Sequence, residues 1–474
     1  MAKALKVDIC VIGAGSGGLS VAAGASQMGA STALIERGKM GGDCLNYGCV
    51  PSKALLAAGH AAQAVRGGGR FGVRAAAPAI DSGGVYGHVR GTIAAIAPND
   101  SVERFEGLGV TVIQSSARFT GPREIAADGY RITARRIVIA TGSSPVVPPV
   151  AGLGDVPYLT NETIFDLGQV PAHLIVIGGG PVGIEMAQAH RHLGARVTVV
   201  EMFSILASDD PELVDVVRAR LAGEGIDLRE GVTVARVEKA GNGVAVVIAG
   251  NDAEDRVQGS HVLIAAGRRP NVGGLDLEKA GIAYSPAGIQ VDARLRTTNR
   301  RVFAIGDVAG GYQFTHMAGY HAGIVLRNAL FRLPAKVDTH AVPWVTYTAP
   351  ELAQVGLTED RARKQAGDIR VLRWPFAEND RARAERETDG LVKVITTPRG
   401  RILGAGIVGA HAGELIHAWV LAIGQKIKIG AVAGMIAPYP TLGEANKRAA
   451  GSFYTPALFG ERTKRIVRFL SHFG

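Results

Sequence analysis

A chain of 474 residues, 47% of them hydrophobic, is long enough for three or four domains of roughly 100–150 residues, each with its own core. Its net charge of +10 permits weak attraction to anions, but no long run of Lys and Arg and no alternation of basic with aromatic residues supports nucleic-acid binding. Three cysteines do not make a disulfide framework, and no signal peptide or membrane span is expected. The predicted compartment is therefore a reducing cytoplasm, where a disulfide would be catalytic.

The first predicted strand covers residues 7–12 and runs into a Gly-x-Gly-x-x-Gly pattern that opens an Ala-rich helix. The first glycine of such a pattern makes a tight turn, the second lets the backbone approach a pyrophosphate, and the third lets the helix pack on the strand. Glu36 ends the next predicted strand, 31–35, where a carboxylate can accept a hydrogen bond from a ribose hydroxyl. These features predict a dinucleotide site. The three glycines are Gly13, Gly15 and Gly18.

Residues 41–53 read Gly-Gly-Asp-Cys-Leu-Asn-Tyr-Gly-Cys-Val-Pro-Ser-Lys and hold two of the three cysteines, Cys44 and Cys49. By itself a Cys-x4-Cys pair can be a disulfide, half of a metal site, or chance. A helix is predicted over 54–65, continuing the one that carries Cys49 and Lys53, whose spacing of four residues puts both side chains on one face.

The next elements complete the first dinucleotide segment. A second helical region is expected over 81–106 and a strand over 110–113. A buried strand beginning at Arg136 then enters a turn at Thr141-Gly142-Ser143, and the Pro-rich stretch 145–149 is expected to be a linker.

A second fingerprint repeats the plan of the first one. The strand 174–177 leads into three glycines, and the strand 196–200 ends at Glu201, which lies as far beyond its first glycine as Glu36 does in the first copy. Two fingerprints imply two dinucleotides. Glu201 favours NAD, because an acid binds a free 2′-hydroxyl and repels a 2′-phosphate, and Arg196 comes too early in its strand to bind that phosphate. The glycines are Gly178, Gly180 and Gly183.

The first fingerprint followed by Gly-Gly-x-Cys-x4-Cys-x-Pro-x-Lys resembles the class I pyridine nucleotide-disulfide oxidoreductases, in particular the branch of dihydrolipoamide dehydrogenase and mercuric reductase. The resemblance runs over nearly the whole chain. It implies an α/β fold with two Rossmann-like dinucleotide-binding domains, for FAD and for NAD with NADH preferred over NADPH, plus a C-terminal α+β dimerisation domain in a homodimer. The expected boundaries are 1–150 (FAD, first part), 151–272 (NAD), 273–340 (FAD and central, second part) and 341–474 (dimerisation).

The resemblance also assigns residues to the cofactors. Asp307, after the strand that begins at Val302, would aim its carboxylate at the ribityl hydroxyls of the flavin, the alternative being a helix N-cap. His316 opens a helix beside the flavin ring, where it can equally be a cap or core residue, and it is not expected to be catalytic. The other residues expected at the cofactors are Gly42, Lys53, Ala117, Thr141, Gly142, Ser143, Val234, Gly267, Gly306, Phe314 and Thr315.

At the redox motif, the resemblance implies that Cys49 lies against the flavin as a charge-transfer thiolate and that Cys44 attacks the substrate through a mixed disulfide. A helix N-terminus and Lys53 would lower the thiol pKa, as that chemistry requires. Lys53 would lie near flavin N5 and pair with Glu185, the alternative being two unrelated surface charges. Cys10 is expected to be an inert core thiol, and no metal site is predicted.

The sequence departs from the family at the expected proton donor. The family carries His-Pro-Thr-x-x-Glu, donated by the other subunit, but here Tyr439 stands in place of the histidine and Glu444 is kept. A tyrosine with an ordinary pKa near 10 is a poor general base at neutral pH. A tyrosine here is similar to mercuric reductase, yet no cysteine follows Cys49 to deliver a metal. The family threonine before the first cysteine is Asp43 here, a further departure.

A small disulfide is accordingly the first choice of acceptor, with a thiophilic ion such as Hg(II) or Cu(II) as the alternative. A non-catalytic scaffold or a membrane-docked flavoprotein with another acceptor is the rival of a different class. The C-terminal segment 461–474 is basic and amphipathic, and either packs on the dimer or makes weak contact with an anionic membrane surface.

Overall fold

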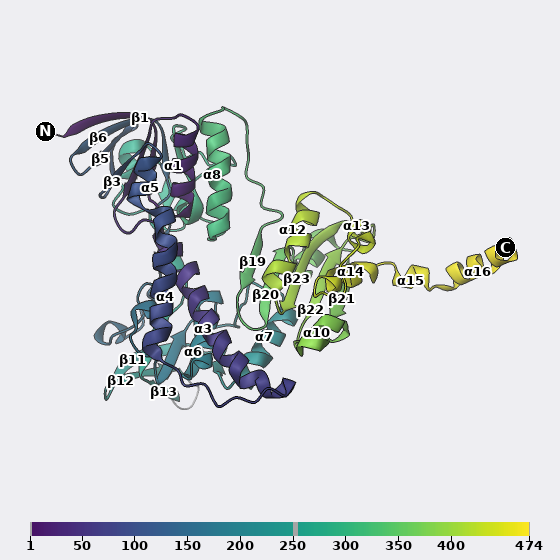
Figure 1. The fold of residues 1–474 in the computed structure, drawn as a ribbon. Coiled ribbons are helices and arrows are strands. Elements are labelled where there is room, and N and C mark those ends of the chain that lie inside the picture. Colours follow the sequence, from purple (N-terminus) through teal and green to yellow (C-terminus); the bar gives the residue numbers. More distant parts are fainter. Residues whose placement is uncertain (1, 250–254, 474) are drawn as a thin grey trace. The chain divides into compact units, whose positions relative to one another are not determined.

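The computed structural model describes residues 2–249 and 255–473, so Gly474 of the basic segment and residues 250–254 of the expected NAD domain lie outside it. The chain forms two compact units. The first runs from the N-terminus to Met202 and includes Leu228–Val337. The second joins Phe203–Asp227 to the chain from Asp338 onward. Figure 1 gives the order of the helices and strands.

A seven-stranded sheet is the centre of the first unit, in the order β3-β2-β1-β6-β5-β4 with β18 also paired to β6. β1 pairs in parallel with both β2 and β6, so that Ile12 lies between Ile35 and Ile139. The carboxyl ends of these three strands therefore meet at one edge, where Gly13 and Glu36 follow. The strands are β1 (Lys3–Ile12), β2 (Thr32–Glu36), β3 (Val110–Gln114), β4 (Arg118–Gly121), β5 (Glu124–Ala127), β6 (Tyr130–Ile139) and β18 (Val302–Ala304).

Side chains of β1 alternate between two cores, as the period of a strand requires. Ile9 and Val11 pack in the cluster formed with α1 (Ser16–Gln27) and α8 (Thr315–Ala329). Cys10 and Ile12 enter the cluster on the opposite face. Figure 1 shows α1 and α8 side by side over the sheet. Cys10 has no exposed surface, and burial raises its pKa to about 12, which fits an inert core thiol.

The helix after the redox motif is confirmed and is longer than predicted. α2 (Gly42–Asn46) precedes α3 (Cys49–Gly67), which begins at the second cysteine of the motif. α3 packs closely on α6 (Pro181–His192), because a Cβ added at Gly59 would lie 3.1 Å from the Cβ of His192. This contact joins the middle of α3 to the last residue of α6.

The helical region expected over 81–106 is two helices. α4 (Ser82–Ile96) and α5 (Val102–Gly107) are separated by a 3-10 turn, Ala97–Asp100, that contains Pro98. Proline removes a backbone donor and clashes with a continuing helix, which explains the break.

The second fingerprint lies on a four-stranded sheet of order β10-β9-β8-β14. In it, β8 pairs in parallel with β9 and β14, and Ile177 lies between Val200 and Ile264. This edge repeats the geometry of the first fingerprint. An antiparallel sheet, β11-β12-β13, belongs to the same unit. The strands are β8 (His173–Ile177), β9 (Arg196–Val200), β10 (Asp227–Arg229), β14 (His261–Ile264), β11 (Val234–Ala240), β12 (Gly243–Ile248) and β13 (Asp255–Gly259).

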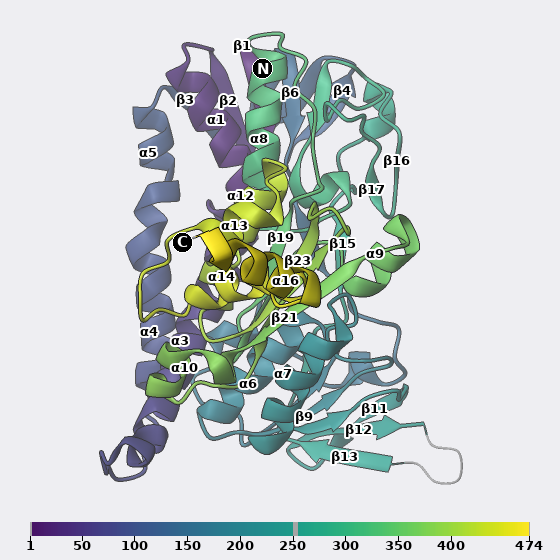
Figure 2. The ribbon, with the colours of Figure 1, turned by 90° about the vertical axis from the view of Figure 1, so that its right-hand side faces the viewer.

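The second unit is built on an antiparallel five-stranded sheet of order β19-β20-β23-β22-β21. Figure 2 shows α12, α13 and α14 beside these strands, and their apolar residues join the strands in one core around Trp419. The strands are β19 (Pro343–Thr346), β20 (Glu351–Gly356), β21 (Arg370–Pro375), β22 (Leu391–Thr396) and β23 (Ile402–Gly409). The helices are α7 (Pro211–Gly223), α9 (Glu359–Ala366), α10 (Asp380–Glu385), α11 (Ala412–Leu415), α12 (His417–Gly424), α13 (Ile429–Gly434), α14 (Glu444–Gly451), α15 (Thr455–Leu458) and α16 (Glu461–Leu470).

Short elements complete the fold. Two pairs of short strands, β7 (Ser143–Pro145) with β15 (Arg268–Pro270) and β16 (Tyr284–Ser285) with β17 (Gly288–Ile289), are antiparallel. Over residues 2–249 and 255–473, no helix is both long and apolar enough to cross a membrane.

Candidate functional site

The two cysteines of the redox motif lie at a sharp change of chain direction. Cys44 is in α2 and is half-buried, and Cys49 is the exposed first residue of α3. Both are free thiols, and the Cys49 sulfur lies 3.3 Å from the Thr315 hydroxyl at the start of α8. Cys49 therefore combines a helix N-terminus with a hydroxyl from a segment far away in sequence.

The surroundings of the two thiols separate their acidities. A hydrogen bond from the Cys44 thiol, the Thr315 hydroxyl and the charge of Lys53 lower the pKa of Cys49 to about 6, against burial and the Asp43 carboxylate. The pKa of Cys44 is raised, first by the hydrogen bond that it gives to Cys49 and then by burial. These contacts favour Cys49 over Cys44 as the thiol that ionises first.

Replacing Thr315 by Val is expected to raise the pKa of Cys49. A hydrogen bond to a charged group contributes about 1.5–3 kcal/mol, so the pH midpoint for alkylation of reduced Cys49 should rise by roughly one to two units. Iodoacetamide labelling across pH, resolved by mass spectrometry of the peptide, measures this midpoint. Thr92→Val, which removes a hydroxyl bonded to the His88 carbonyl, is the control. An unchanged midpoint in Thr315→Val would show that the hydroxyl does not stabilise the thiolate.

The ion pair expected between Lys53 and Glu185 is present. Lys53 Nζ on α3 lies 2.7 Å from Glu185 Oε2 on α6, and the Glu185 side chain is only 6% exposed while that of Lys53 is 37% exposed. A carboxylate that is buried to this extent needs a cation, so Glu185 fixes the ammonium within reach of the dithiol.

The glycines of the first fingerprint fit a bound cofactor. A Cβ at Gly13, where φ is +105°, would lie 2.4 Å from the Ala140 carbonyl oxygen, and one at Gly18 would lie 1.8 Å from the Gly13 oxygen. Gly15 differs, because the nearest atom to its Cβ would be the Gly42 Cα at 3.9 Å. The fold itself leaves room at Gly15, which is the position where a pyrophosphate would approach the backbone.

The second fingerprint has the same division of roles. A Cβ at Gly178, where φ is +114°, would lie 2.4 Å from the Ala265 oxygen, and one at Gly183 would lie 2.0 Å from the Gly178 oxygen. A Cβ at Gly180 would meet nothing within 4 Å. The open second glycine again fits a dinucleotide phosphate.

The two strand-end acids are held alike. Glu36 Oε2 accepts from Ala14 N and Glu201 Oε2 accepts from Gly179 N, each at 2.6 Å. In both copies the carboxylate therefore binds the backbone of the residue that follows the first glycine. The chain also brings Arg229 to this place, since Glu201 N donates to the Arg229 carbonyl, but the guanidinium of Arg229 pairs with Asp255 at 3.0 Å.

Asp43, the departure before Cys44, is part of a polar chain. Its Oδ1 lies 3.1 Å from a nitrogen of Arg268 and accepts from Asn161 Nδ2 at 3.0 Å. Arg268 Nε donates to the Ser143 hydroxyl at 2.8 Å, and Ser143 donates to Asp307 at 2.6 Å. The carboxylate therefore has a cationic partner beside the expected FAD phosphates, which gives this substitution a physical account. Asp307 is the last residue in this series of hydrogen bonds, and burial raises the pKa of its carboxyl group.

The loop at Thr141 and Gly142, which is expected to close the FAD segment, is held by hydrogen bonds to one residue. Asn271 Nδ2 donates to the Thr141 carbonyl at 3.0 Å, Asn271 N donates to the Gly142 carbonyl at 2.9 Å, and the Thr141 hydroxyl donates back to the Asn271 carbonyl at 2.8 Å. Gly306 N donates to Nδ1 of the buried His321 at 3.2 Å, which holds the turn that carries Asp307.

The remaining expected cofactor residues belong to the first unit as well. The Phe314 and His316 rings stack with centroids 5.1 Å apart at the entry to α8. Gly42 has φ +60°, and its Cβ would lie 2.7 Å from the Gly15 Cα, so it joins the redox motif to the fingerprint. Ala117 is a buried core residue before β4, Val234 begins β11, and Gly267 lies in the loop before β15 with φ +118°.

Tyr439 and Glu444 lie in the second unit and have separate partners. The Tyr439 side chain is exposed, and its hydroxyl donates to Asp380 Oδ2 at 3.1 Å. Asp380 raises the pKa of Tyr439, so even less phenolate is present at neutral pH to act as a base. Glu444 pairs with Arg448 at 2.8 Å on α14.

Sequence reasoning missed several residues of the site. Arg268 and Asn271 lie in the stretch 267–271, which reads Gly-Arg-Arg-Pro-Asn and is similar to a motif of the family, and Asp380 lies in the stretch 379–382, which also fits the family. Both stretches were usable signals, whereas nothing in the sequence pointed to Asn161. Across the part of the chain that the structure describes, no three His, Cys, Asp or Glu side chains are grouped so as to hold a metal ion.

Comparison with known proteins identifies relatives over almost the whole chain. Residues 7–322 match the family Pyridine nucleotide-disulphide oxidoreductase, and residues 342–450 match the dimerisation domain of the same family. Mercuric reductase of Staphylococcus aureus is 35% identical over 449 residues, covering 94% of this chain and 82% of that protein. Dihydrolipoyl dehydrogenase of Thermus scotoductus is 36% identical over 465 residues, covering 95% and 98%.

Among solved structures, the Cu(II) complex of the HOCl-induced flavoprotein disulfide reductase RclA from Escherichia coli has a similar fold. It superposes with a TM-score of 0.84 at 28% identity, covering 93% of this chain and 99% of that one. The family and the fold class predicted from the sequence are confirmed.

Proposed function

Because the chain belongs to the FAD-dependent pyridine nucleotide-disulfide oxidoreductases, we propose that its Cys44–Cys49 dithiol passes electrons from NADH to a small disulfide acceptor. The observation that supports this most is the asymmetric thiol pair at the start of α3, with Thr315 and Lys53 lowering the pKa of Cys49. Bound FAD would supply the two-electron link between the nicotinamide and the dithiol.

The residues of the chain then have distinct roles. Cys44 passes its proton along the hydrogen bond to the Cys49 thiolate and attacks one sulfur of the acceptor disulfide. The other sulfur leaves as a thiolate and takes up this proton from Cys49, which is a thiolate again. The Cys49 thiolate attacks the Cys44 sulfur, which frees the second thiol and forms the Cys44–Cys49 disulfide. Two electrons that originate from NADH restore the dithiol. Lys53, held by Glu185, keeps positive charge beside Cys49 during this cycle.

The cofactor pockets, assembly and location form part of the same proposal. The glycines and acids of 13–36 hold FAD, and those of 178–201 hold NAD, with NADH preferred because Glu201 faces the turn and the Arg229 guanidinium is paired with Asp255. We divide the chain by these roles into four segments. FAD is bound by 1–150 and 273–340, NAD is bound by 151–272, and 341–474 forms the dimer. The enzyme acts as a homodimer in the cytoplasm, and Tyr439 and Glu444 of one subunit serve the dithiol of the other.

A thiophilic metal ion is the second candidate acceptor. Tyr439 has a raised pKa and cannot replace a histidine as a base, and relatives include mercuric reductases and the Cu(II)-bound RclA. A thiolate pair can bind Hg(II) or Cu(II) without a base.

Anaerobic NADH oxidation by the purified protein, with lipoamide and separately with Hg(II), tests the proposal. We expect the native protein to reduce lipoamide, and Tyr439→His to do so on the order of 10²-fold faster, because a positioned general acid–base contributes at least this much. Tyr284→His is the matched control, since Tyr284 is also an exposed tyrosine bonded to a carboxylate, that of Glu278.

Two other results would change the assignment. Absence of lipoamide turnover in the native protein together with rapid Hg(II)-dependent NADH oxidation would favour the metal acceptor. Failure of NADH to reduce the flavin at all would leave only a non-catalytic flavoprotein.

A further inference from the structure

The C-terminal helix α16 and the residues after it form an exposed apolar surface. We name it the tail face, and none of the residues in α15 or α16 is buried. The rings of Phe469 and Phe473 contact each other edge to face at 5.2 Å between centroids, which extends the surface past the end of α16. The tail face consists of Ile466 (48% exposed), Val467 (60%), Phe469 (64%), Leu470 (57%) and Phe473 (74%).

The apolar surface continues toward the preceding helix. Leu458 and Phe459, at the end of α15, are 57% and 71% exposed. The Thr463 hydroxyl donates to the Ala457 carbonyl at 2.7 Å and ties the first turn of α16 to α15. A group of large exposed apolar side chains like this one is typical of a surface that binds another protein or a membrane.

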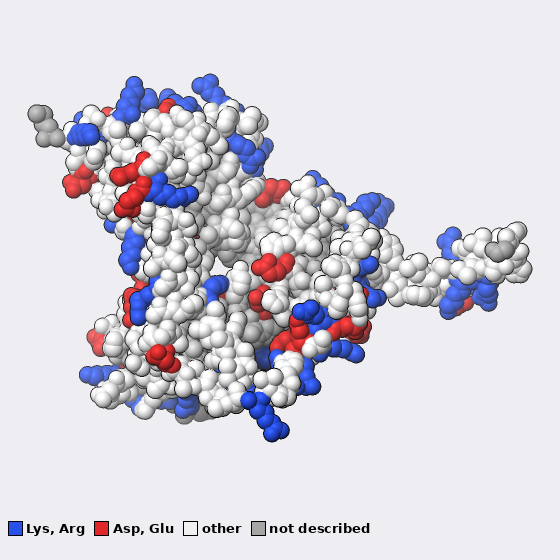
Figure 3. Space-filling model, in the orientation of Figure 1, with Lys and Arg blue, Asp and Glu red and all other residues white. Residues whose placement is uncertain are grey.

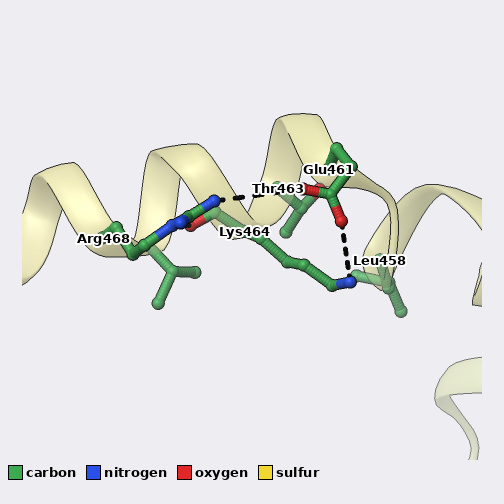
Figure 4. A pocket seen from close by; sticks show the side chains of 6 residues that line it. Leu458, Glu461, Thr463, Lys464 and Arg468 are labelled. Carbon is green, nitrogen blue, oxygen red and sulfur yellow. Dashed lines mark hydrogen bonds and ion pairs between the residues drawn. The ribbon is translucent and has the colours of Figure 1, made fainter.

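The other side of α16 is strongly basic. Its cations are Lys464, Arg465 and Arg468, and Arg462 is a fourth cation at the edge of the apolar face, against the one carboxylate of Glu461. Figure 4 shows Glu461 between Lys464 and Arg468, which it approaches at 2.9 and 3.9 Å. Figure 3 shows Lys and Arg side chains on the C-terminal segment, more of them below it than above it, while most of its remaining surface is uncharged.

The geometry points to an anionic membrane surface as the partner of this helix. A helix with an apolar face and a basic polar face lies in the lipid interface, where the apolar side chains enter the acyl boundary and the cations meet lipid phosphates. Arg462 lies next to the apolar face, where a long side chain can extend its guanidinium to the phosphates while its methylenes stay in the boundary.

A second copy of the helix is a poorer partner. Two such helices would bring eight cations together against two carboxylates, and like charges in a contact oppose it. The match to the dimerisation domain covers residues 342–450 and does not include α16. The membrane contact is independent of the dithiol chemistry, since it uses none of its residues.

Vesicle flotation with the full-length flavoprotein tests the proposal. The native protein is expected to float with vesicles of equal parts phosphatidylcholine and phosphatidylglycerol, to float poorly with phosphatidylcholine alone, and to dissociate at high salt. The Phe469→Ser/Leu470→Ser and the Arg465→Glu/Arg468→Glu variants should each bind at least about tenfold more weakly.

The matched control is Phe331→Ser/Leu333→Ser, which removes two exposed apolar side chains elsewhere, 57% and 50% exposed, and should float like the native protein. NADH-dependent flavin reduction and the sedimentation coefficient should be unchanged in every variant. Failure of the native protein to float with anionic vesicles would overturn the proposal. So would equal flotation of the tail variants, or loss of the dimer in them, which would instead assign the tail face to a second copy.

Discussion

Cys44→Ser is expected to abolish reduction of the external acceptor while leaving reduction of the flavin by NADH intact. Turnover with lipoamide or Hg(II) should fall on the order of 10³-fold or more, because a serine hydroxyl is not ionised at neutral pH and cannot form the mixed disulfide. Serine keeps a donor beside Cys49, so the pKa of Cys49 should stay well below that of a free thiol. Anaerobic stopped-flow absorbance separates the fast flavin step from the lost acceptor step.

The third cysteine provides the control for this experiment. Cys10 is fully buried in β1, and Cys10→Ala should retain acceptor turnover at the native level. Acceptor reduction by Cys44→Ser at more than a small fraction of the native rate would show that electrons leave the flavin by another route. The dithiol would then be dispensable.

The features that the sequence predicted well are those carried by short stretches of chain. Gly13 and Gly178 adopt positive φ and sit against the backbone of the neighbouring strand, so their role could be inferred from spacing alone. The predicted helix after the redox motif is present for the same reason, since its Ala-rich stretch and the glycines that end it are local signals. Its N-terminus at Cys49 follows from the same stretch.

Apart from Lys53 and Glu185, which the resemblance paired, the long-range partners of the site were not predicted. Asp43 looked anomalous because the residues that bond it, Asn161 and Arg268, lie more than a hundred positions away. Tyr439 and its partner Asp380 are also distant in sequence, 59 positions apart. Such pairs depend on how strands and helices pack, and no periodicity in one sequence encodes them. The grouping of 203–227 with the C-terminal unit is another result of packing.

One contact within that grouping is a buried ion pair of Lys393 on β22 with Asp210, and Lys393→Met is expected to destabilise the second unit. The side chain is 4% exposed and lies 2.9 Å from Asp210, 2.7 Å from Glu212 and 2.8 Å from Glu359. Removing one partner from a buried ion pair typically costs about 3–5 kcal/mol, and here the Asp210 carboxylate, 4% exposed, would stay buried without its cation. Urea unfolding followed by tryptophan fluorescence measures it, since all three tryptophans lie in this unit.

The pH dependence of the free energy of unfolding provides a second test of these ion pairs. The Arg373 guanidinium first, and then Lys393, lower the pKa of Glu212 to about 2, so its folded pKa lies below its unfolded value near 4.5. Glu212 therefore stabilises the fold above about pH 4.5, and this contribution is lost as the pH falls toward 2. Lys393→Met should reduce this contribution and flatten the acid limb of the stability profile.

Lys279→Met is the matched control, because Lys279 pairs with Asp276 at 2.9 Å but is 58% exposed, and such a pair contributes about 0–1 kcal/mol. If Lys393→Met unfolded at the same urea concentration as Lys279→Met, the ion pairs of Lys393 would not contribute measurably to stability. Water would then solvate the carboxylates once the ammonium group is removed. The join between 203–227 and the sheet would then have to come from apolar contacts such as Leu213 against the strand that carries Gly406.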